Sequence, residues 1–107
     1  MPTPSSKLTL AEALEIVSGV IADMNSGEDA DRQVVVYEED TIERDLVFGF
    51  LCNTKKFKET RNPRHALLGI GPIIVNRRTG NVEVCGSNPP YHAGVDIYER
   101  MAAAGDW

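Results

Sequence analysis

The clearest pattern in the chain is a stripe of hydrophobic residues at three- and four-residue spacing between positions 10 and 24. This spacing places the side chains on one face of an amphipathic helix. Thr9 and Glu12 fit a capping box at the start of that helix, in which each side chain bonds the other residue's backbone. Gly27 ends the segment Asn-Ser-Gly and favours a helix stop, because glycine accepts the left-handed conformation. The stripe consists of Leu10, Leu14, Val17, Ile21 and Met24.

Four shorter segments have the composition of β-strands. Residues 34–37 are β-branched and aromatic, and residues 46–52 are almost continuously apolar, with Gly49 as the one weak point. Residues 72–76 and 82–85 flank a turn that contains Thr79-Gly80, which predicts a hairpin. The polar residues 28–33 and 53–63 are expected to be surface loops.

A second helix is predicted near the end of the sequence. Asn88 is a suitable N-cap, and Pro89 and Pro90 fit a first turn, where the missing N–H costs nothing. Its inner face would consist of Val95, Tyr98, Met101 and Ala102, with Gly105 at its end.

The order of these elements predicts an α+β fold. Sequential strands joined by short connections normally pair antiparallel, and a sheet needs a covered face to be stable. We therefore expect an antiparallel sheet of about four strands flanked by an N-terminal and a C-terminal helix. A flexible arm over residues 1–7 would precede a single domain over residues 8–107.

Charge and cysteine content narrow the range of partners. The 107 residues carry 11 basic and 16 acidic side chains, a net charge of −5, so nucleic acid is an unfavourable ligand and a basic protein a favourable one. No apolar run is long enough to span a membrane, and residues 1–10 lack the apolar segment of a secretory signal, so a cytoplasmic protein is expected. Cys52 and Cys85 form no CxxC motif, which indicates reduced thiols without a disulfide framework or zinc site.

The strongest local charge feature is a group of five carboxylates within eight positions, with Arg44 as the one basic residue among them. They form either a solvated strand edge, which also prevents aggregation, or a binding face for a basic protein surface. Calcium binding is a lesser option, because the ligand spacing and central glycine of a calcium loop are missing. The five residues are Glu38, Glu39, Asp40, Glu43 and Asp45.

Catalytic chemistry finds little support in the sequence, and neither an enzyme nor a cofactor is expected. His65 and His92 lack a carboxylate or cysteine at ligand spacing. Cys52 lies in an apolar strand, which favours an inert core thiol over a nucleophile. The glycines at 69 and 71 precede a strand, not a helix, which indicates a turn and not a phosphate-binding loop.

The segment LGIGPIIVNRRTGNV at residues 68–82 resembles the hallmark of the immunity protein 35 family, also called the YrhB-like domain. The segments FGF at 48–50, NTKKF at 53–57 and GSNPP at 86–90 are similar to other parts of that family, and the likeness covers about residues 8–100. The chain departs from the family in having Phe48 where a tryptophan is usual and Gly49 where a bulky residue is usual.

The resemblance implies a small bacterial protein that neutralises a cognate polymorphic toxin by covering its active or functional surface, and it implies no catalytic residues. The alternative is a heat-stable, chaperone-like holdase, which would need an exposed apolar patch. For a toxin inhibitor, the partner-binding candidates are the five carboxylates with a set of aromatic anchors. These anchors are Tyr37, Phe48, Phe57 and Tyr91, with Trp107 as a further candidate.

The sequence also supports expectations about the last tryptophan and the paired arginines. Trp107 is expected to dock on the protein, because a free indole is costly to expose. Arg77 and Arg78, at the predicted hairpin turn, are expected to be ordinary surface residues.

Overall fold

The computed structural model describes residues 7–67, 69–86 and 88–107. It confirms the α+β class, with a four-stranded antiparallel sheet between an N-terminal and a C-terminal helix. Apart from Lys7, the predicted N-terminal arm lies outside the described residues. The elements are α1 (Leu10–Asn25), η1 (Ala30–Arg32), β1 (Val34–Glu43), β2 (Val47–Thr54), α2 (Lys55–Thr60), η2 (Pro63–His65), β3 (Ile73–Asn76), β4 (Val82–Val84) and α3 (Tyr91–Ala103).

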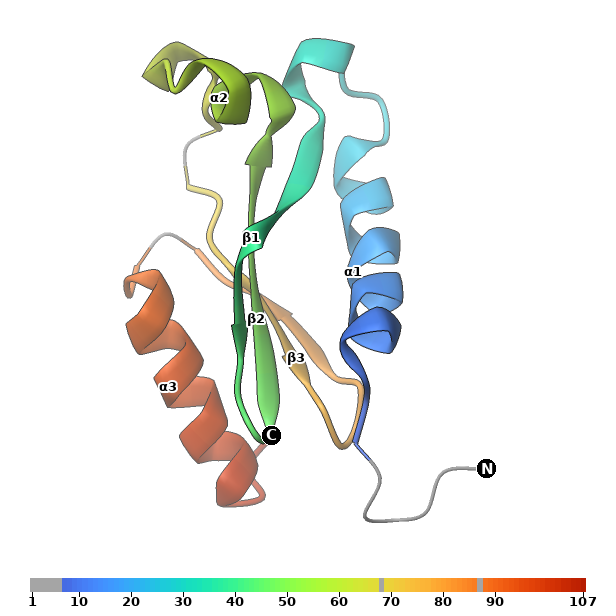
Figure 1. Ribbon diagram of the computed structural model, residues 1–107, viewed down its shortest axis with the longest axis vertical. Helices are drawn as coiled ribbons and strands as arrows, with labels where there is room; N and C mark the ends of the chain where they lie inside the picture. Colours follow the sequence, from blue (N-terminus) through green and yellow to red (C-terminus); the bar gives the residue numbers. More distant parts are fainter. Residues whose placement is uncertain (1–6, 68, 87) are drawn as a thin grey trace.

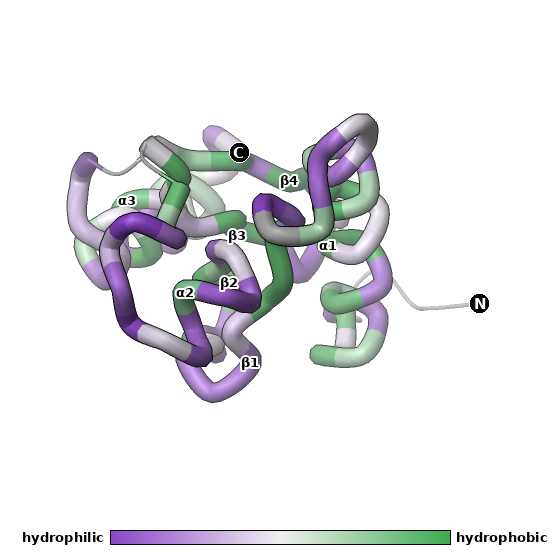
Figure 2. The backbone as a smooth tube through the Cα atoms, turned by 90° about the horizontal axis from the view of Figure 1, so that it is seen from above, coloured by the Kyte–Doolittle hydropathy of each residue, from purple (hydrophilic) through white to green (hydrophobic). Residues whose placement is uncertain are grey.

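The sheet has the strand order β1-β2-β3-β4, so β1 and β4 are its two edges. In Figure 1, α1 lies on one side of the sheet, α3 on the other, and α2 at one end. Figure 2 shows the hydrophobic positions of β3 between α3 and α1. The helices therefore enclose the sheet in three layers, with one hydrophobic core against α1 and another against α3.

The alternation of side chains along β2 feeds both cores. Phe48, Phe50 and Cys52 pack on the α1 side, whereas Val47 packs on the α3 side. Burial on both faces explains why the β2 sequence is almost continuously apolar. Gly49 lies where side chains of α3 pack tightly against β2, so a glycine is suited to this position. A Cβ atom there would lie 2.6 Å from Cγ2 of Val95.

The ends of the two long helices have different causes. The predicted capping box of α1 is confirmed, with the Thr9 and Glu12 side chains bonding each other's backbone N–H groups. The predicted start of α3 at Asn88 is wrong, because α3 begins at Tyr91 with Pro90 as its N-cap. A residue that precedes proline avoids the helical conformation, so Pro89, before Pro90, cannot lie in the first turn.

Two polar segments are more regular than the sequence predicted. The expected loop at 53–63 contains the end of β2 and the short helix α2, which Thr54 caps by accepting a hydrogen bond from the Phe57 N–H at 3.0 Å. The expected loop at 28–33 contains the 3₁₀ turn η1. The first strand continues to Glu43 instead of ending at Tyr37, so part of the acidic segment belongs to the sheet.

No helix in the described ranges is long and apolar enough to cross a membrane.

Candidate functional site

The acidic segment forms a bulge on the outer strand of the sheet. Tyr37 of β1 pairs with Leu51 of β2, and Ile42 pairs with Gly49. Four residues of β1 therefore stand opposite the single residue Phe50, which pushes residues 38–41 out of the regular ladder. We call residues 38–41 the acidic bulge.

Tyr91, the first residue of α3, holds the acidic bulge in place. Its hydroxyl donates a hydrogen bond to the backbone oxygen of Asp40 at 2.8 Å. Burial raises the pKa of Tyr91 to about 12, so its hydroxyl stays protonated and able to donate at neutral pH. Gly49 allows this contact, because a Cβ atom there would lie 3.1 Å from Cε1 of Tyr91. A cleft of about 420 Å³ lies beside this contact, lined by residues 39–42, Leu51, Tyr91 and His92.

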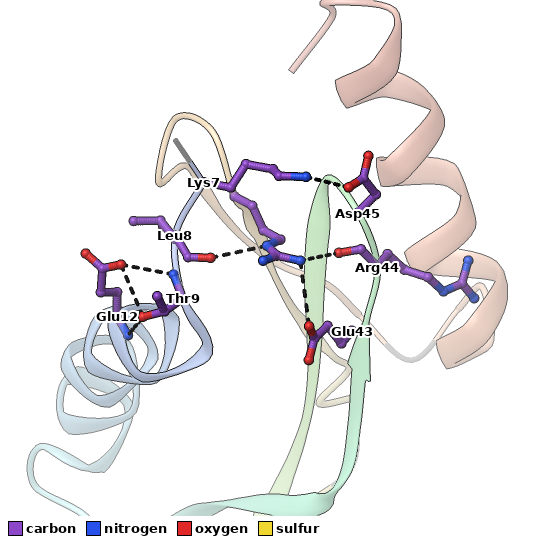
Figure 3. A network of polar contacts seen from close by, with 8 residues as sticks. Lys7, Leu8, Thr9, Glu12, Glu43, Arg44 and Asp45 are labelled. Carbon is purple, nitrogen blue, oxygen red and sulfur yellow. Dashed lines mark hydrogen bonds and ion pairs between the residues drawn. The ribbon is translucent and has the colours of Figure 1, made fainter. Parts of the chain in front are cut away.

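Three of the five predicted carboxylates are already paired within the protein. Lys58 of α2 bonds Glu39 at 2.9 Å and lowers the pKa of that carboxyl group. The guanidinium of Arg77 lies 3.9 Å from Glu43. Lys7 bonds Asp45 and lowers its pKa, and Figure 3 shows this pair close to the start of α1.

Arg44, the one basic residue within the acidic segment, turns away from it. Its Nη1 lies 2.7 Å from Oδ1 of Asp96 and 3.4 Å from Oε1 of Glu99, both on α3. Arg44 therefore ties the β1–β2 turn to α3 and pairs with no carboxylate of the acidic bulge.

Glu38 and Asp40 form no ion pair with any described residue. Glu38 lines a groove between β1 and α1, whereas Asp40 lines the cleft beside Tyr91. Of the five predicted carboxylates, these two are therefore the ones that no described basic side chain pairs with. Because strand alternation sets which way each side chain points, the sequence count of carboxylates could not separate these two from the rest.

Two of the predicted partner-binding aromatic residues lie inside the protein instead. Tyr37 is 2% exposed and donates its hydroxyl to the backbone oxygen of Thr54 at 2.6 Å. Phe48 is completely buried, with the guanidinium of Arg77 stacked 4.3 Å from the centre of its ring. Their positions in the alternating strands explain the burial, and neither ring can reach a partner in this fold.

The other aromatic candidates have mixed positions. Phe57 is half-buried on α2, with Arg61 5.9 Å from its ring centre, and Tyr91 is half-buried beside the acidic bulge. Trp107 docks as predicted: its ring packs edge-on against Tyr98 at 5.0 Å. Of the predicted aromatic anchors, Tyr91 is the one that lines the cleft beside the bulge.

The β3–β4 turn holds distant parts of the chain together, which the sequence did not reveal. Arg77 donates to the backbone oxygens of Leu8 at 3.2 Å and Arg44 at 2.7 Å, as Figure 3 shows around those two residues. Arg78 donates to the backbone oxygen of Ala102 at 2.6 Å. The expectation of an ordinary surface residue is therefore wrong for Arg77, which is half-buried. Arg78 is exposed as expected, yet its side chain also bonds a backbone oxygen of α3.

The two cysteines are free and lie on opposite sides of the sheet. Cys52 belongs to the core against α1, and burial raises the pKa of its thiol to about 11. Cys85 packs against the α3 core, and burial raises its pKa as well. A thiol held protonated at neutral pH is a poor nucleophile, which agrees with an inert role.

The two histidines lie in different parts of the fold. His65 lies in η2, at the end of the sheet where α2 begins, whereas His92 is exposed on α3. Across residues 7–67, 69–86 and 88–107, no group of three histidine, cysteine or carboxylate side chains could hold a metal ion.

Comparison with known families identifies the chain. The family model described as Immunity protein 35 matches residues 11–94. The chain belongs to the Immunity protein 35 family. No curated protein and no solved structure matches the chain.

The Immunity protein 35 match covers the acidic bulge, Tyr91 and the β3–β4 turn. The resemblance noted at residues 68–82 is thereby confirmed at the level of the family. In this Immunity protein 35 member, the arginines of that segment bond backbone oxygens elsewhere in the fold, whereas the two unpaired carboxylates of the acidic segment lie on β1.

Proposed function

We propose that this protein neutralises a bacterial polymorphic toxin by binding it through the acidic bulge and Tyr91. One observation carries the proposal: in a member of an immunity protein family, Glu38 and Asp40 extend from a bulged outer strand without a basic partner among the described residues. Uncompensated carboxylates attract a basic surface and accelerate its association. The partner would be a toxin domain with a basic patch.

The structure of the site suits a binding role. The hydrogen bond from Tyr91 to Asp40 fixes the bulge before any partner arrives, so less conformational entropy is lost on binding. The half-buried ring of Tyr91 adds an aromatic surface next to the charges, the combination found at strong interaction sites. The protein would act in the cytoplasm of the producing cell, by covering the toxin and without a cofactor, during competition between bacteria.

The chaperone-like alternative lacks a supporting observation. The large hydrophobic side chains exposed among the described residues are Leu10, Val84 and Ile97. Leu10 lies on α1, while Val84 and Ile97 share a small groove of about 250 Å³ between β4 and α3. A holdase needs a broad apolar surface, and this pair of side chains does not provide one.

The proposal is tested by a pull-down from lysate of the producing organism with the tagged full chain, at low and at high salt. We expect one dominant basic protein that contains a toxin domain and is lost at high salt, because screening weakens pairing with Glu38 and Asp40. A broad mixture of partly unfolded proteins that is insensitive to salt would contradict the proposal and support the holdase.

A further inference from the structure

The outer edge of β1 lies beside an open groove formed with α1. The groove has a volume of about 480 Å³. One wall is apolar and the other carries the backbone edge of a strand that has no neighbour on that side. It is lined by Leu14, Ser18, Ile21 and Ala22 from α1, and by residues 34–36 and Glu38 from β1.

One residue of α1 already bonds this strand edge as another strand would. The side chain of Asn25 donates to the backbone oxygen of Val34 at 3.0 Å and accepts from the Val34 N–H at 2.6 Å. An antiparallel partner strand makes the same pair of bonds. The Asn25 bonds thus show that the N–H and C=O of Val34 point away from β2.

Further along β1, at Val36, the backbone groups on this edge have no partner among the described residues. Backbone groups alternate in direction along a strand, so the N–H and C=O of Val36 point to the same outer side as those of Val34. No described residue bonds these outer groups of Val36. Glu38 lines the groove as well, and its carboxylate is one of the two among the five predicted carboxylates that have no ionic partner among the described residues.

We propose that an extended segment of the toxin adds to the sheet along β1, from Val36 to Glu38, with its side chains in the α1–β1 groove. This inference rests on the proposed function and names the second part of the same interface. The segment would exchange backbone hydrogen bonds with Val36, place an apolar side chain against α1 and a lysine or arginine opposite Glu38. Backbone bonds supply affinity in such strand addition, and the groove supplies specificity.

The fold favours this position and limits its length. Asn25 occupies the edge at Val34, and the register shift after Tyr37 ends the regular ladder, so the pairing is short. Glu38 lines the α1–β1 groove and is also the first residue of the acidic bulge, so a charged side chain lies directly beside the free strand edge. A short pairing next to a charged bulge also protects the edge from indiscriminate strand pairing.

The test is residue-resolved amide hydrogen exchange on the full chain, alone and in complex with the toxin domain identified in the pull-down. The Val36 N–H is expected to exchange at least about tenfold more slowly in the complex, because it gains a hydrogen bond. The Val35 N–H bonds to β2 and serves as the internal control, with slow exchange in both states. An unchanged exchange rate at Val36 in a stable complex would overturn the inference.

A matched pair of variants tests the groove without touching the strand. Ala22→Gln narrows the groove, whereas Ala11→Gln introduces the same side chain at an exposed position of α1 outside it. We expect about tenfold weaker binding for Ala22→Gln and no change for Ala11→Gln. If both bind normally while Glu38→Lys abolishes binding, strand addition is wrong and the proposed function stands. If no toxin domain binds the protein at all, both fail together.

Discussion

At the residue scale, Asn76 shows how one buried polar side chain organises a turn. Its Oδ1 accepts hydrogen bonds from the N–H groups of Arg78 at 2.9 Å and Thr79 at 3.2 Å. Its Nδ2 donates to the backbone oxygen of Trp107 at 2.8 Å. Asn76 is 1% exposed, so its polar atoms depend on these bonds for partners. This side chain joins the hairpin that carries the family resemblance to the C-terminal tryptophan.

Replacing Asn76 with alanine is expected to destabilise the fold. Asn76→Ala should lower the free energy of unfolding by about 2–4 kcal/mol, because several backbone groups lose their partner. Asn81→Ala in the same turn is the matched control, since that side chain is exposed. It should change stability by less than about 0.5 kcal/mol. Urea unfolding followed by circular dichroism measures both, and similar losses for the two variants would contradict this role of Asn76.

The residue scale is also where prediction from the sequence was weakest. Tyr37 and Phe48 were sensible anchors by residue type, but their burial depends on which face of the strand each side chain occupies. Arg77 carries no sequence signal for its bonds to Leu8 and Arg44, because these residues meet only in the folded chain. Long-range contacts of this kind cannot be read from local spacing.

At the scale of elements, the packing of α3 against β2 determines the shape of the candidate site. α3 approaches the sheet closely at Gly49, which brings Tyr91 to the acidic bulge. The bulge then turns Asp40 towards the cleft beside Tyr91. A glycine in a central strand, usually unfavourable, thus contributes to the presentation of the charged surface.

Adding a methyl group at Gly49 is expected to disturb both the stability and the site. Gly49→Ala should lower the free energy of unfolding by about 1–3 kcal/mol, because its Cβ atom would overlap Val95. Gly19→Ala on α1 is the control, since nothing lies within 4 Å of the added atom. The control should stabilise the protein by about 0.5–1 kcal/mol through helix propensity. Thermal unfolding distinguishes them, and a neutral Gly49→Ala would show that α3 adjusts easily.

Helices and strands can be predicted from the sequence where the hydrophobic pattern is long, but not where it is short. α1 was predicted from its stripe and capping box, and both are present. α2 was missed, because its six residues are too few to establish a helical period. The extension of β1 was missed because carboxylates are typical of loops, yet an edge strand tolerates them in water.

At the scale of the whole molecule, charge is unevenly distributed. Residues 55–65 carry five basic side chains and one acidic side chain, a net charge of +4, which leaves −9 for the rest of a chain whose total is −5. The basic segment lies around α2 at one end of the molecule in Figure 1. The net charge of the whole chain does not reveal this separation of basic and acidic residues. The α+β class and element order could be predicted, whereas the pairing of Glu39 with Lys58 required the fold.

We expect local charge at the acidic bulge, and not net charge, to recruit the toxin. The most direct test is the association rate constant with the toxin domain at low and high salt. Two double variants with the same change in net charge are compared. Glu38→Lys with Asp40→Lys reverses the bulge, and Asp29→Lys with Asp106→Lys reverses two other exposed carboxylates.

We predict that the bulge variant associates about tenfold more slowly at low salt and that high salt largely removes the difference, because screening shortens the reach of the charges. The control variant should remain close to the unmodified protein under both conditions. Equal slowing by both variants, or no slowing by either, would contradict the claim that Glu38 and Asp40 form the recognition surface.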